Sequence, residues 1–554
     1  MARGRNTRKV LMPKGAMAVA TKWDGTHGSY LTGIGALNKA RFDEVELFSI
    51  REPYAYARVI YDRENAEYLY EVWEPQLTGK EQKLLDLVKD ALNRTLEYEW
   101  EKMATKDKEE YLNEAVESFL KSRGIKLEPA MHEKLRYYIT RDFVGYGRLD
   151  AMMNDARIED VSCDGVGIPL FIFHQKYESL KTNVMFQDED VLNNFVVALG
   201  QRCGKQISVA APILDGTSYE GNRVQATYAR EVTTRGSSFT IRRFKENPFT
   251  PVELIKFGTA SPEMVAYLWI AIEHGESLMV CGGTASGKTA TLNSAALFIR
   301  PGAKIVSIED TREINLPHEN WIPGTTRSGI GERGADGKAP GEIDMYDLVR
   351  AALRQRPNFI IVGEVRGKET YTMFQAMATG HPTMSTMHAD SVKSMVNRLE
   401  NPPINTPRIL LTALKFVIIQ KHARVGDSTV RRITQVVELV GFEPETNELI
   451  TNTVYEWDPG TDSFLYKGHS FLFDEIMEMK NMTHEEMEEE FQRRVDIVNY
   501  MVEKNLTFFR EISKVVVSYY QYPEETAKRI REEMGWVRET TKTEQLTGGE
   551  SVGQ

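Results

Sequence analysis

Residues 278–289 read LMVCGGTASGKT, and this stretch decides the fold. The apolar run 278–281 is expected to be a buried strand, and residues 289–299 are expected to form the helix that follows. Between them, residues 282–289 match the phosphate-loop pattern G-x-x-x-x-G-K-[ST] at every fixed position. At ordinary residue frequencies, a chain of this length would match four fixed positions by chance about 2% of the time. The stretch therefore predicts an α/β domain that binds a nucleotide.

The composition of this loop suits a polyphosphate. Glycines let the backbone curl so that amide groups point at phosphate oxygens, and the N-terminus of the following helix adds partial positive charge. Lys288 is expected to reach the β- and γ-phosphates of ATP, and the Thr289 hydroxyl is expected to ligate Mg²⁺. The loop residues expected to contact the nucleotide are Gly282, Gly283, Thr284, Ala285, Ser286, Gly287, Lys288, Thr289 and Ala290.

A second apolar stretch, 359–364, reads FIIVGE and ends in the carboxylate of Glu364. A carboxylate at a strand end can accept a hydrogen bond from the attacking water and align it on the γ-phosphate. The usual second motif has Asp before this Glu, but here Gly363 takes its place. Carboxylate support for the metal must then come from elsewhere or through water. Glu309, at the end of the apolar run 305–308, is the candidate, although this segment on its own could be an ordinary polar loop.

Two histidines bracket a short strand-like run in residues 379–390, TGHPTMSTMHAD. His381 and His388 could sense the γ-phosphate and relay its loss, or they could be ordinary structural histidines. The sequence leaves both readings open. Metal binding by the pair is less favoured, because no cysteine or third histidine stands nearby.

Composition excludes several classes of protein. The 554 residues include 69 Lys and Arg against 80 Asp and Glu, and 41% of them are apolar, as in globular proteins and unlike disordered chains. The longest apolar run, 264–272, is too short to span a membrane, and no signal-peptide pattern follows the basic start. The net charge of −11 argues against a protein that grips nucleic acid over its whole surface. We therefore expect a soluble, multidomain cytoplasmic protein.

The three cysteines and the basic N-terminus carry weaker signals. Cys163, Cys203 and Cys281 are too few and too scattered for a disulfide framework or a four-thiolate zinc site, so each is expected to be a small buried residue. Residues 1–22 carry six cations and no carboxylate. This segment is read as a solvated arm, with docking to anionic lipid or nucleic acid as the alternative.

Taken in order, the four motifs resemble the secretion ATPase superfamily, which includes the motors of type II and type IV secretion and of type IV pili. The resemblance covers the loop and its continuation to 293, the acidic box 308–310, the second motif 362–366 without its Asp, and the histidine box 380–388. The chain is similar to archaeal members from about 125 to 520, and most of all to the archaellum (archaeal flagellum) motor ATPase. Archaeal pilus-assembly and secretion ATPases share much of this pattern. Further segments that carry the archaeal resemblance are 145–150, 223–226, 238–244, 351–357 and 451–455.

The resemblance implies a fold class and a domain layout. The fold is expected to be α/β, with a C-terminal RecA-like P-loop NTPase core preceded by a mixed α/β (PAS-like) N-terminal domain and with extra helical segments at both ends. Asn247-Pro248 and Thr250-Pro251 interrupt the pattern and suggest the linker. The expected parts are an extension with a basic arm and short strands at 1–75, a helical region at 76–144, an α/β domain contributing to the nucleotide site at 145–246, a linker at 247–250, the ATPase domain at 251–480, and a helical region with a disordered tail at 481–554.

Site roles also follow from the resemblance. Glu364 is implied to be the catalytic carboxylate, Lys288 the phosphate-binding lysine, and Glu309 a further catalytic and metal-binding carboxylate of the acidic box. His388 is placed with the catalytic groups and His381 with the nucleotide contacts. Family members also use arginines of the preceding domain, and Arg223 and Arg242 match those positions; both could equally be plain surface residues.

The function implied is an ATP-hydrolysing motor that assembles or rotates an archaeal pilus-like filament, or drives secretion, using ATP and Mg²⁺. ATP would close the N-terminal and core domains about the linker, and hydrolysis would let them reopen. Expected partners are five further copies in a homo-hexamer, a polytopic membrane platform protein, accessory motor proteins and the pilin or archaellin machinery. These would hold the protein peripherally at the inner face of the cell membrane. Two rivals are a nucleic-acid translocase, for which no basic, aromatic-lined pore is evident, and a non-hydrolysing switch, against which Lys288, Thr289 and Glu364 argue.

Overall fold

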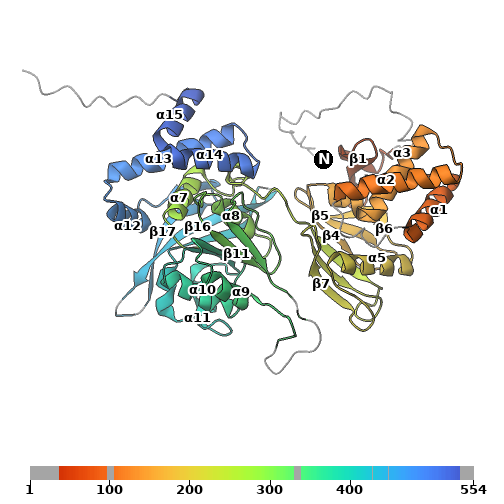
Figure 1. The fold of residues 1–554 in the computed structure, drawn as a ribbon. Coiled ribbons are helices and arrows are strands. Elements are labelled where there is room, and N and C mark those ends of the chain that lie inside the picture. The colour runs from red at the N-terminus through yellow and green to blue at the C-terminus, as the bar shows by residue number, and fades with distance from the viewer. Residues whose placement is uncertain are drawn as a thin grey trace, which may run out of the picture. The chain divides into compact units, whose positions relative to one another are not determined.

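The computed structural model describes residues 37–95, 105–327, 329, 338–426, 428–443, 445–446 and 448–536. The chain divides into two compact units that meet in sequence between Arg243 and Phe244. Each unit is described by itself (Figure 1). The predicted basic arm at 1–22 and the predicted disordered tail at 547–554 lie outside the described residues.

The described residues of the first unit form one nine-stranded sheet in the order β1-β2-β3-β6-β5-β4-β9-β8-β7. Its neighbouring strands are antiparallel except for β3 and β6, which run parallel. The strands are β1 (Phe42–Arg51), β2 (Ala55–Asp62), β3 (Glu67–Trp73), β4 (Ile158–Cys163), β5 (Pro169–His174), β6 (Glu178–Met185), β7 (Ile213–Thr217), β8 (Arg223–Thr227) and β9 (Ser238–Arg242). The helices are α1 (Gly79–Thr95), α2 (Thr105–Ser122), α3 (Pro129–Phe143), the 3₁₀ turn η2 (Gly147–Leu149), α4 (Asp150–Asn154) and α5 (Glu189–Arg202).

This unit joins stretches that the sequence analysis keeps apart. Leu69 and Tyr70 of β3 pair with Lys181 and Thr182 of β6, so the strands of 42–73 belong to the same sheet as the α/β domain of 145–246. Side chains from the strands, from α1 to α3 and from α5 also share one apolar core. A small sheet needs a hydrophobic face or packing against other elements to be stable, and the pairing of β3 with β6 joins these strands to a larger sheet. The expected separate extension is therefore part of one folded unit.

The second unit is built on another nine-stranded sheet, again counted over the described residues, in the order β12-β11-β13-β14-β10-β15-β16-β17-β18. Neighbours from β12 to β15 run parallel, and those from β15 to β18 run antiparallel. The strands are β10 (Leu278–Gly282), β11 (Ile305–Glu309), β12 (Trp321–Thr325), β13 (Phe359–Val362), β14 (Thr383–Met387), β15 (Phe416–Val425), β16 (Ser428–Phe442), β17 (Leu449–Asp458) and β18 (Ser463–Tyr466). The helices are α6 (Pro251–Lys256), α7 (Pro262–Glu273), α8 (Lys288–Ala296), α9 (Met345–Leu353), α10 (Glu369–Ala378), α11 (Val392–Glu400), the 3₁₀ helix η3 (Arg408–Ala413), α12 (Phe471–Lys480), α13 (His484–Glu503), α14 (Phe509–Gln521) and α15 (Pro523–Met534).

Strand β10 lies inside this sheet and is buried on both faces. Leu278 and Val280 join the core that contains α7 and α8, whereas Met279 and Cys281 join the core that contains α9, α10 and α11. This alternation follows from the two-residue period of a strand. The parallel α/β architecture expected from the sequence is confirmed. The antiparallel extension β16–β18 was not predicted; each of its strands follows the previous one after a short turn, and so short a connection can only reverse the chain.

The C-terminal helices pack on the same core as the phosphate-loop helix. α13 begins at the predicted capping box, in which Thr483 and Glu486 exchange hydrogen bonds, and its buried face packs on α7. The Trp269 indole stacks on Phe298 with ring centroids 4.9 Å apart. Tyr520 of α14 accepts a hydrogen bond from the indole N–H (3.0 Å) and donates one to the Phe298 carbonyl (2.6 Å). The region set apart at 481–554 is therefore, as far as it is described, continuous with the core around the phosphate-loop helix.

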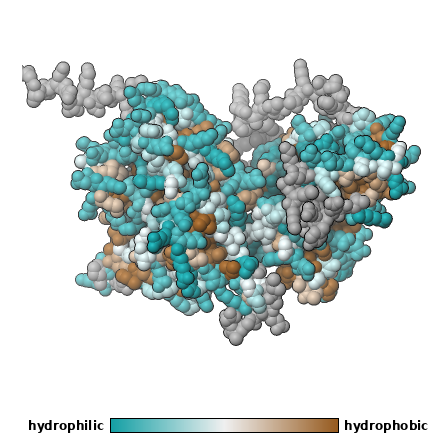
Figure 2. Space-filling view, in the orientation of Figure 1, coloured by the Kyte–Doolittle hydropathy of each residue, from teal (hydrophilic) through white to brown (hydrophobic). Residues whose placement is uncertain are grey.

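The described helices, the visible surface (Figure 2) and the cysteines bear on the expectations from the sequence. No helix among the described residues is both long enough and apolar enough to cross a bilayer. Figure 2 shows a face on which hydrophilic residues predominate and hydrophobic ones form small separate groups. Cys163 and Cys281 are buried as expected, Cys203 is half-buried, and all three are free thiols.

Candidate nucleotide site

The phosphate loop lies at the carboxyl end of β10, between the parallel strands β14 and β15. Gly287 has φ +95° and is the N-cap of α8, so the loop turns there through a left-handed conformation that glycine adopts without strain. The helix then begins at Lys288, with its first backbone N–H groups at the loop. This is the strand–loop–helix arrangement that the sequence predicts, and it suits a bound phosphate.

Lys288 is held inside the loop. Its side chain is buried, with the residue 8% exposed, and its ammonium donates to the Gly283 carbonyl at 2.9 Å, which also accepts from the Ser286 hydroxyl at 2.9 Å. Burial lowers the pKa of the Lys288 ammonium, and the nearby Glu364 carboxylate opposes this shift. A bound polyphosphate would give the desolvated cation a much stronger acceptor than a single carbonyl.

Glu364 and His388 form a pair at the ends of neighbouring strands. Glu364 follows β13 and His388 follows β14, and the His388 Nε2 lies 3.0 Å from the Glu364 Oε1. Burial lowers the pKa of the His388 imidazole; Lys288 acts in the same direction, and Glu364 opposes it. A neutral imidazole can still donate from Nε2 to the carboxylate, so His388 can fix the orientation of Glu364. The pair leaves the second carboxylate oxygen of Glu364 for water.

Glu309 is a buried carboxylate at the end of β11. It is 2% exposed, and its Oε1 accepts hydrogen bonds from the backbone N–H groups of Glu313 (2.9 Å) and Ile314 (3.0 Å). Its Oε2 is buried and has no hydrogen-bond partner among the described residues. Burial raises the pKa of Glu309 to about 7, against the effect of those two N–H donors. A buried carboxylate oxygen without a partner is costly, and either a water or a cation at this position would satisfy it.

The missing Asp of the second motif has a structural explanation. β11 and β13 are neighbours, and Gly363 donates its backbone N–H to the Ile308 carbonyl at 2.8 Å. A Cβ atom on Gly363 would lie 3.0 Å from the Glu309 Cγ. Glu309 therefore fills the space that a side chain at 363 would need, and the adjacent strand supplies a carboxylate next to this position.

The residues present fit a Mg²⁺ ion. Mg²⁺ prefers oxygen ligands and is commonly held by substrate phosphates, waters and one or two protein groups. The Glu309 Oε2 lacks a partner, and the Thr289 hydroxyl belongs to the first turn of α8. Both are oxygen donors of the required kind, as the sequence analysis expects.

His381 belongs to the same unit as the phosphate loop but does not lie at it, and Arg223 and Arg242 belong to the other unit. His381 precedes β14, whereas the phosphate loop follows β10; because these strands are parallel, His381 lies at the opposite edge of the sheet. In the first unit, Arg223 and Arg242 face each other across β8 and β9. Arg223 pairs with Asp215 at 3.6 Å and Arg242 with Asp160 at 3.1 Å. Strand geometry removes His381 from the nucleotide contacts in this unit, and the role of the arginines stays a prediction.

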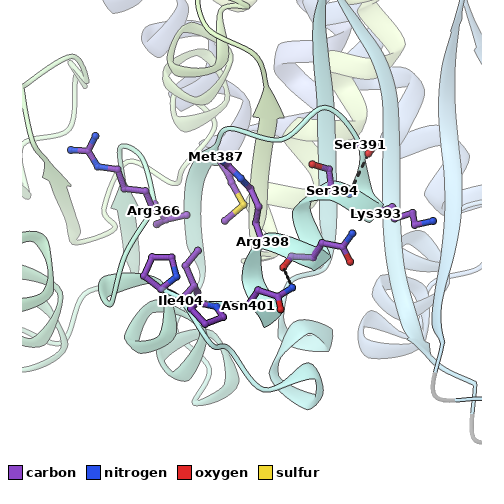
Figure 3. Close-up of a pocket in the computed structure, with 12 residues that line it drawn as sticks. Arg366, Met387, Ser391, Lys393, Ser394, Arg398, Asn401 and Ile404 are labelled. Carbon is purple, nitrogen blue, oxygen red and sulfur yellow. Dashed lines mark hydrogen bonds between the residues drawn. The ribbon is translucent and has the colours of Figure 1, made fainter.

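A cavity of about 520 Å³ adjoins the Glu364–His388 pair (Figure 3). Val365, which follows Glu364, and Met387, which precedes His388, both line it. Arg398 extends from α11 toward Met387 and donates to the His388 carbonyl, while Arg366 points away and pairs with Asp310. The sequence analysis missed Arg398, because this residue lies in the last turn of α11, ten residues after His388, and no motif marks it.

Two further residues that the motifs miss contact the loop from β15 and β16. The Gln420 Oε1 accepts a hydrogen bond from the Thr291 hydroxyl at 2.8 Å, and the Arg431 Nε donates to the Ala285 carbonyl at 3.0 Å. A signal for Gln420 existed: it is a polar residue directly after the buried run 416–419, just as Glu364 and His388 follow theirs. Arg431 had none, because its approach depends on the antiparallel return of β16.

Two family models match the sequence. One, described as "Type II/IV secretion system protein", covers residues 172–543, which is more than half of the chain, and the other, "PilB3-like, N-terminal", covers residues 2–76. The chain belongs to the type II/IV secretion system protein family. The expected secretion ATPase superfamily is thereby confirmed.

Relatives of this secretion-family protein occur in archaea and bacteria. Uncharacterized protein MJ0900 of Methanocaldococcus jannaschii is 35% identical over 478 residues, which cover 82% of this chain and 85% of that one. Type IV secretion system protein PtlH of Bordetella pertussis is 27% identical over 282 residues, covering 45% of this chain and 80% of PtlH. Among solved structures, the ATPase DotB of Legionella pneumophila is 18% identical, with a TM-score of 0.37, over 61% of this chain and 92% of DotB.

The contact between Gly363 and Glu309 yields a prediction for this family member. In the Gly363→Asp variant, the new side chain must displace Glu309 and bring a like charge beside it, so we expect the free energy of unfolding to fall by about 2 kcal/mol. ATP turnover should fall with it. Gly363→Ala, which adds the steric conflict without the charge, should lose less. Urea unfolding of the three proteins measures this, and unchanged stability in Gly363→Asp would show that Glu309 does not occupy this space.

Proposed function

We propose that this chain is a Mg²⁺-dependent ATPase motor that does mechanical work on a membrane-embedded machine of the type IV pilus or secretion kind. One observation carries the proposal: a complete phosphate loop and the Glu364–His388 pair lie at the same edge of one parallel sheet. Both elements are needed for hydrolysis, because the loop binds the phosphates and the carboxylate orients and deprotonates the attacking water. The family match is consistent with this activity.

The chemistry assigned to the chain's own groups is as follows. The Lys288 ammonium exchanges the Gly283 carbonyl for phosphate oxygens and neutralises charge that grows on them during transfer. Glu364 accepts a hydrogen bond from water and takes its proton as the water oxygen bonds to the γ-phosphorus and the bond to the β-phosphate oxygen breaks. His388 keeps the carboxylate in place from the other side. When Mg²⁺ is bound through Thr289 and Glu309, it neutralises charge on the phosphates.

The matches within the family favour a motor that assembles a pilus-like filament. The N-terminal match to a PilB3-like model supports a pilus-type motor, and the archaeal relative supports an archaeal machine. We therefore propose pilus assembly as the main role. Rotation of an archaellum, expected from segments such as 145–150 and 238–244, is the second candidate. In either role we propose a homo-hexamer that docks on a polytopic platform protein at the inner face of the membrane, without nucleic acid.

Cells of the source organism that carry Glu364→Gln in place of the wild-type gene test the role. Loss of surface pili with swimming retained is the expected result. Loss of swimming with pili retained would support the archaellum instead, and retention of both, with protein secretion also intact, would exclude the motor function. Phosphate release by the purified chain, with and without membranes containing the platform protein, tests the activity itself.

A further inference from the structure

Two residues of the β15–β16 hairpin, Gln420 and Arg431, contact the phosphate loop. Both strands belong to the antiparallel part of the sheet, and Gln420 and Arg431 face the loop from adjacent strands. The pairing shifts register between Ile419 and Gln420, so the ladder is irregular at the point where the hairpin passes the loop. Irregularities of this kind are common beside active sites, where they redirect a side chain.

Arg431 binds the part of the loop that is most exposed and most strained. Gly283, Thr284 and Ala285 are exposed, and Ala285 has φ +58°, a conformation that alanine rarely adopts. The Arg431 Nε donates to the Ala285 carbonyl at 3.0 Å. A charged donor on that carbonyl fixes the orientation of the peptide that follows it, and with it the N–H of Ser286.

Gln420 holds the other side of the same turn. It is 1% exposed, and its Oε1 accepts from the hydroxyl of Thr291, which lies in the first turn of α8. Its Nε2 and the Arg431 Cδ lie 2.9 and 3.4 Å from the position of a Cβ on Gly287. The two side chains therefore close on the bare α-carbon of Gly287, which connects the loop to the helix.

We infer that Gln420 and Arg431 are positioning residues that keep the phosphate loop in its nucleotide-accepting shape. Neither residue needs to touch the reacting atoms. They act through Ala285, Gly287 and Thr291, so their loss weakens ATP binding and leaves the chemical step near Glu364 unchanged. This inference rests on the proposed ATP site and extends it to a part of the sheet outside the sequence motifs.

The test uses the full-length protein and ATP with Mg²⁺. Arg431→Ala is expected to raise both the dissociation constant and KM for ATP about tenfold, the usual effect of losing one hydrogen bond from a charged donor, with kcat within about twofold of wild type. Arg431→Lys keeps the charge and should recover part of the affinity. Thr291→Val, which removes the hydroxyl that donates a hydrogen bond to Gln420, should also raise the dissociation constant. Arg424→Ala, an exposed arginine on the same hairpin, is the matched control and should match wild type.

Isothermal titration calorimetry gives the dissociation constants, phosphate release gives KM and kcat, and a melting curve shows that each variant is folded. The inference is overturned if Arg431→Ala and Thr291→Val bind ATP as wild type does, or if Arg431→Ala lowers kcat at unchanged KM. A wild-type protein that binds ATP without turnover contradicts the proposed function, while the binding constants still test the inference.

Discussion

Lys288→Ala is expected to weaken ATP binding by roughly 10²-fold or more, since it removes the one buried cation of the loop. In the wild-type protein this cation is already buried and held by the Gly283 carbonyl. ATP binding therefore does not have to remove water from the ammonium group, and the phosphates gain its full attraction. Alanine leaves the loop backbone and α8 intact, and helix propensity favours it at this position. Calorimetric titration with ATP and Mg²⁺ measures the loss.

The control for this variant is Lys480→Ala, an exposed lysine in the last turn of α12. It should bind ATP as the wild type does. If Lys288→Ala kept wild-type affinity, the loop at 282–289 would not be the phosphate site, and the proposed activity would fall with it.

Glu364→Gln is expected to keep ATP affinity within about threefold and to lower turnover by about 10³-fold or more, as for loss of a general base. The amide has the size of the carboxylate, and its oxygen can still accept from the His388 Nε2, so the pair keeps its geometry. The amide cannot take a proton from water. Single-turnover phosphate release and ATP binding, measured on the same preparation, separate the two effects.

Glu319→Gln, on an exposed turn of the same unit, should retain full turnover. Equal turnover in Glu364→Gln and wild type would move the catalytic role away from this strand end. The carboxylate of Glu309 would then be the next group to test.

The sequence predicts well those features that depend on residues close together in the chain. The strand before the phosphate loop, the helix after it, and Glu364 and His388 directly after their buried runs all follow from local patterns. Strand order is not local, and the features that depend on it were missed or misplaced. The packing of Glu309 against Gly363 needs β11 beside β13, and the distance of His381 from the loop needs β14 parallel to β10. The pairing of β3 with β6, across more than a hundred residues, left no trace in composition.

The contact between the Trp269–Phe298 stack and Tyr520 has a consequence for how the protein is made. The last described helices cover an apolar face of the nucleotide-binding core, so this face stays exposed to water until the ribosome has synthesised α14. Until then the nascent domain exposes aromatic rings of the kind that chaperones bind. Any shortened gene product that ends at residue 480 would keep those rings exposed permanently and would be a target for aggregation and degradation.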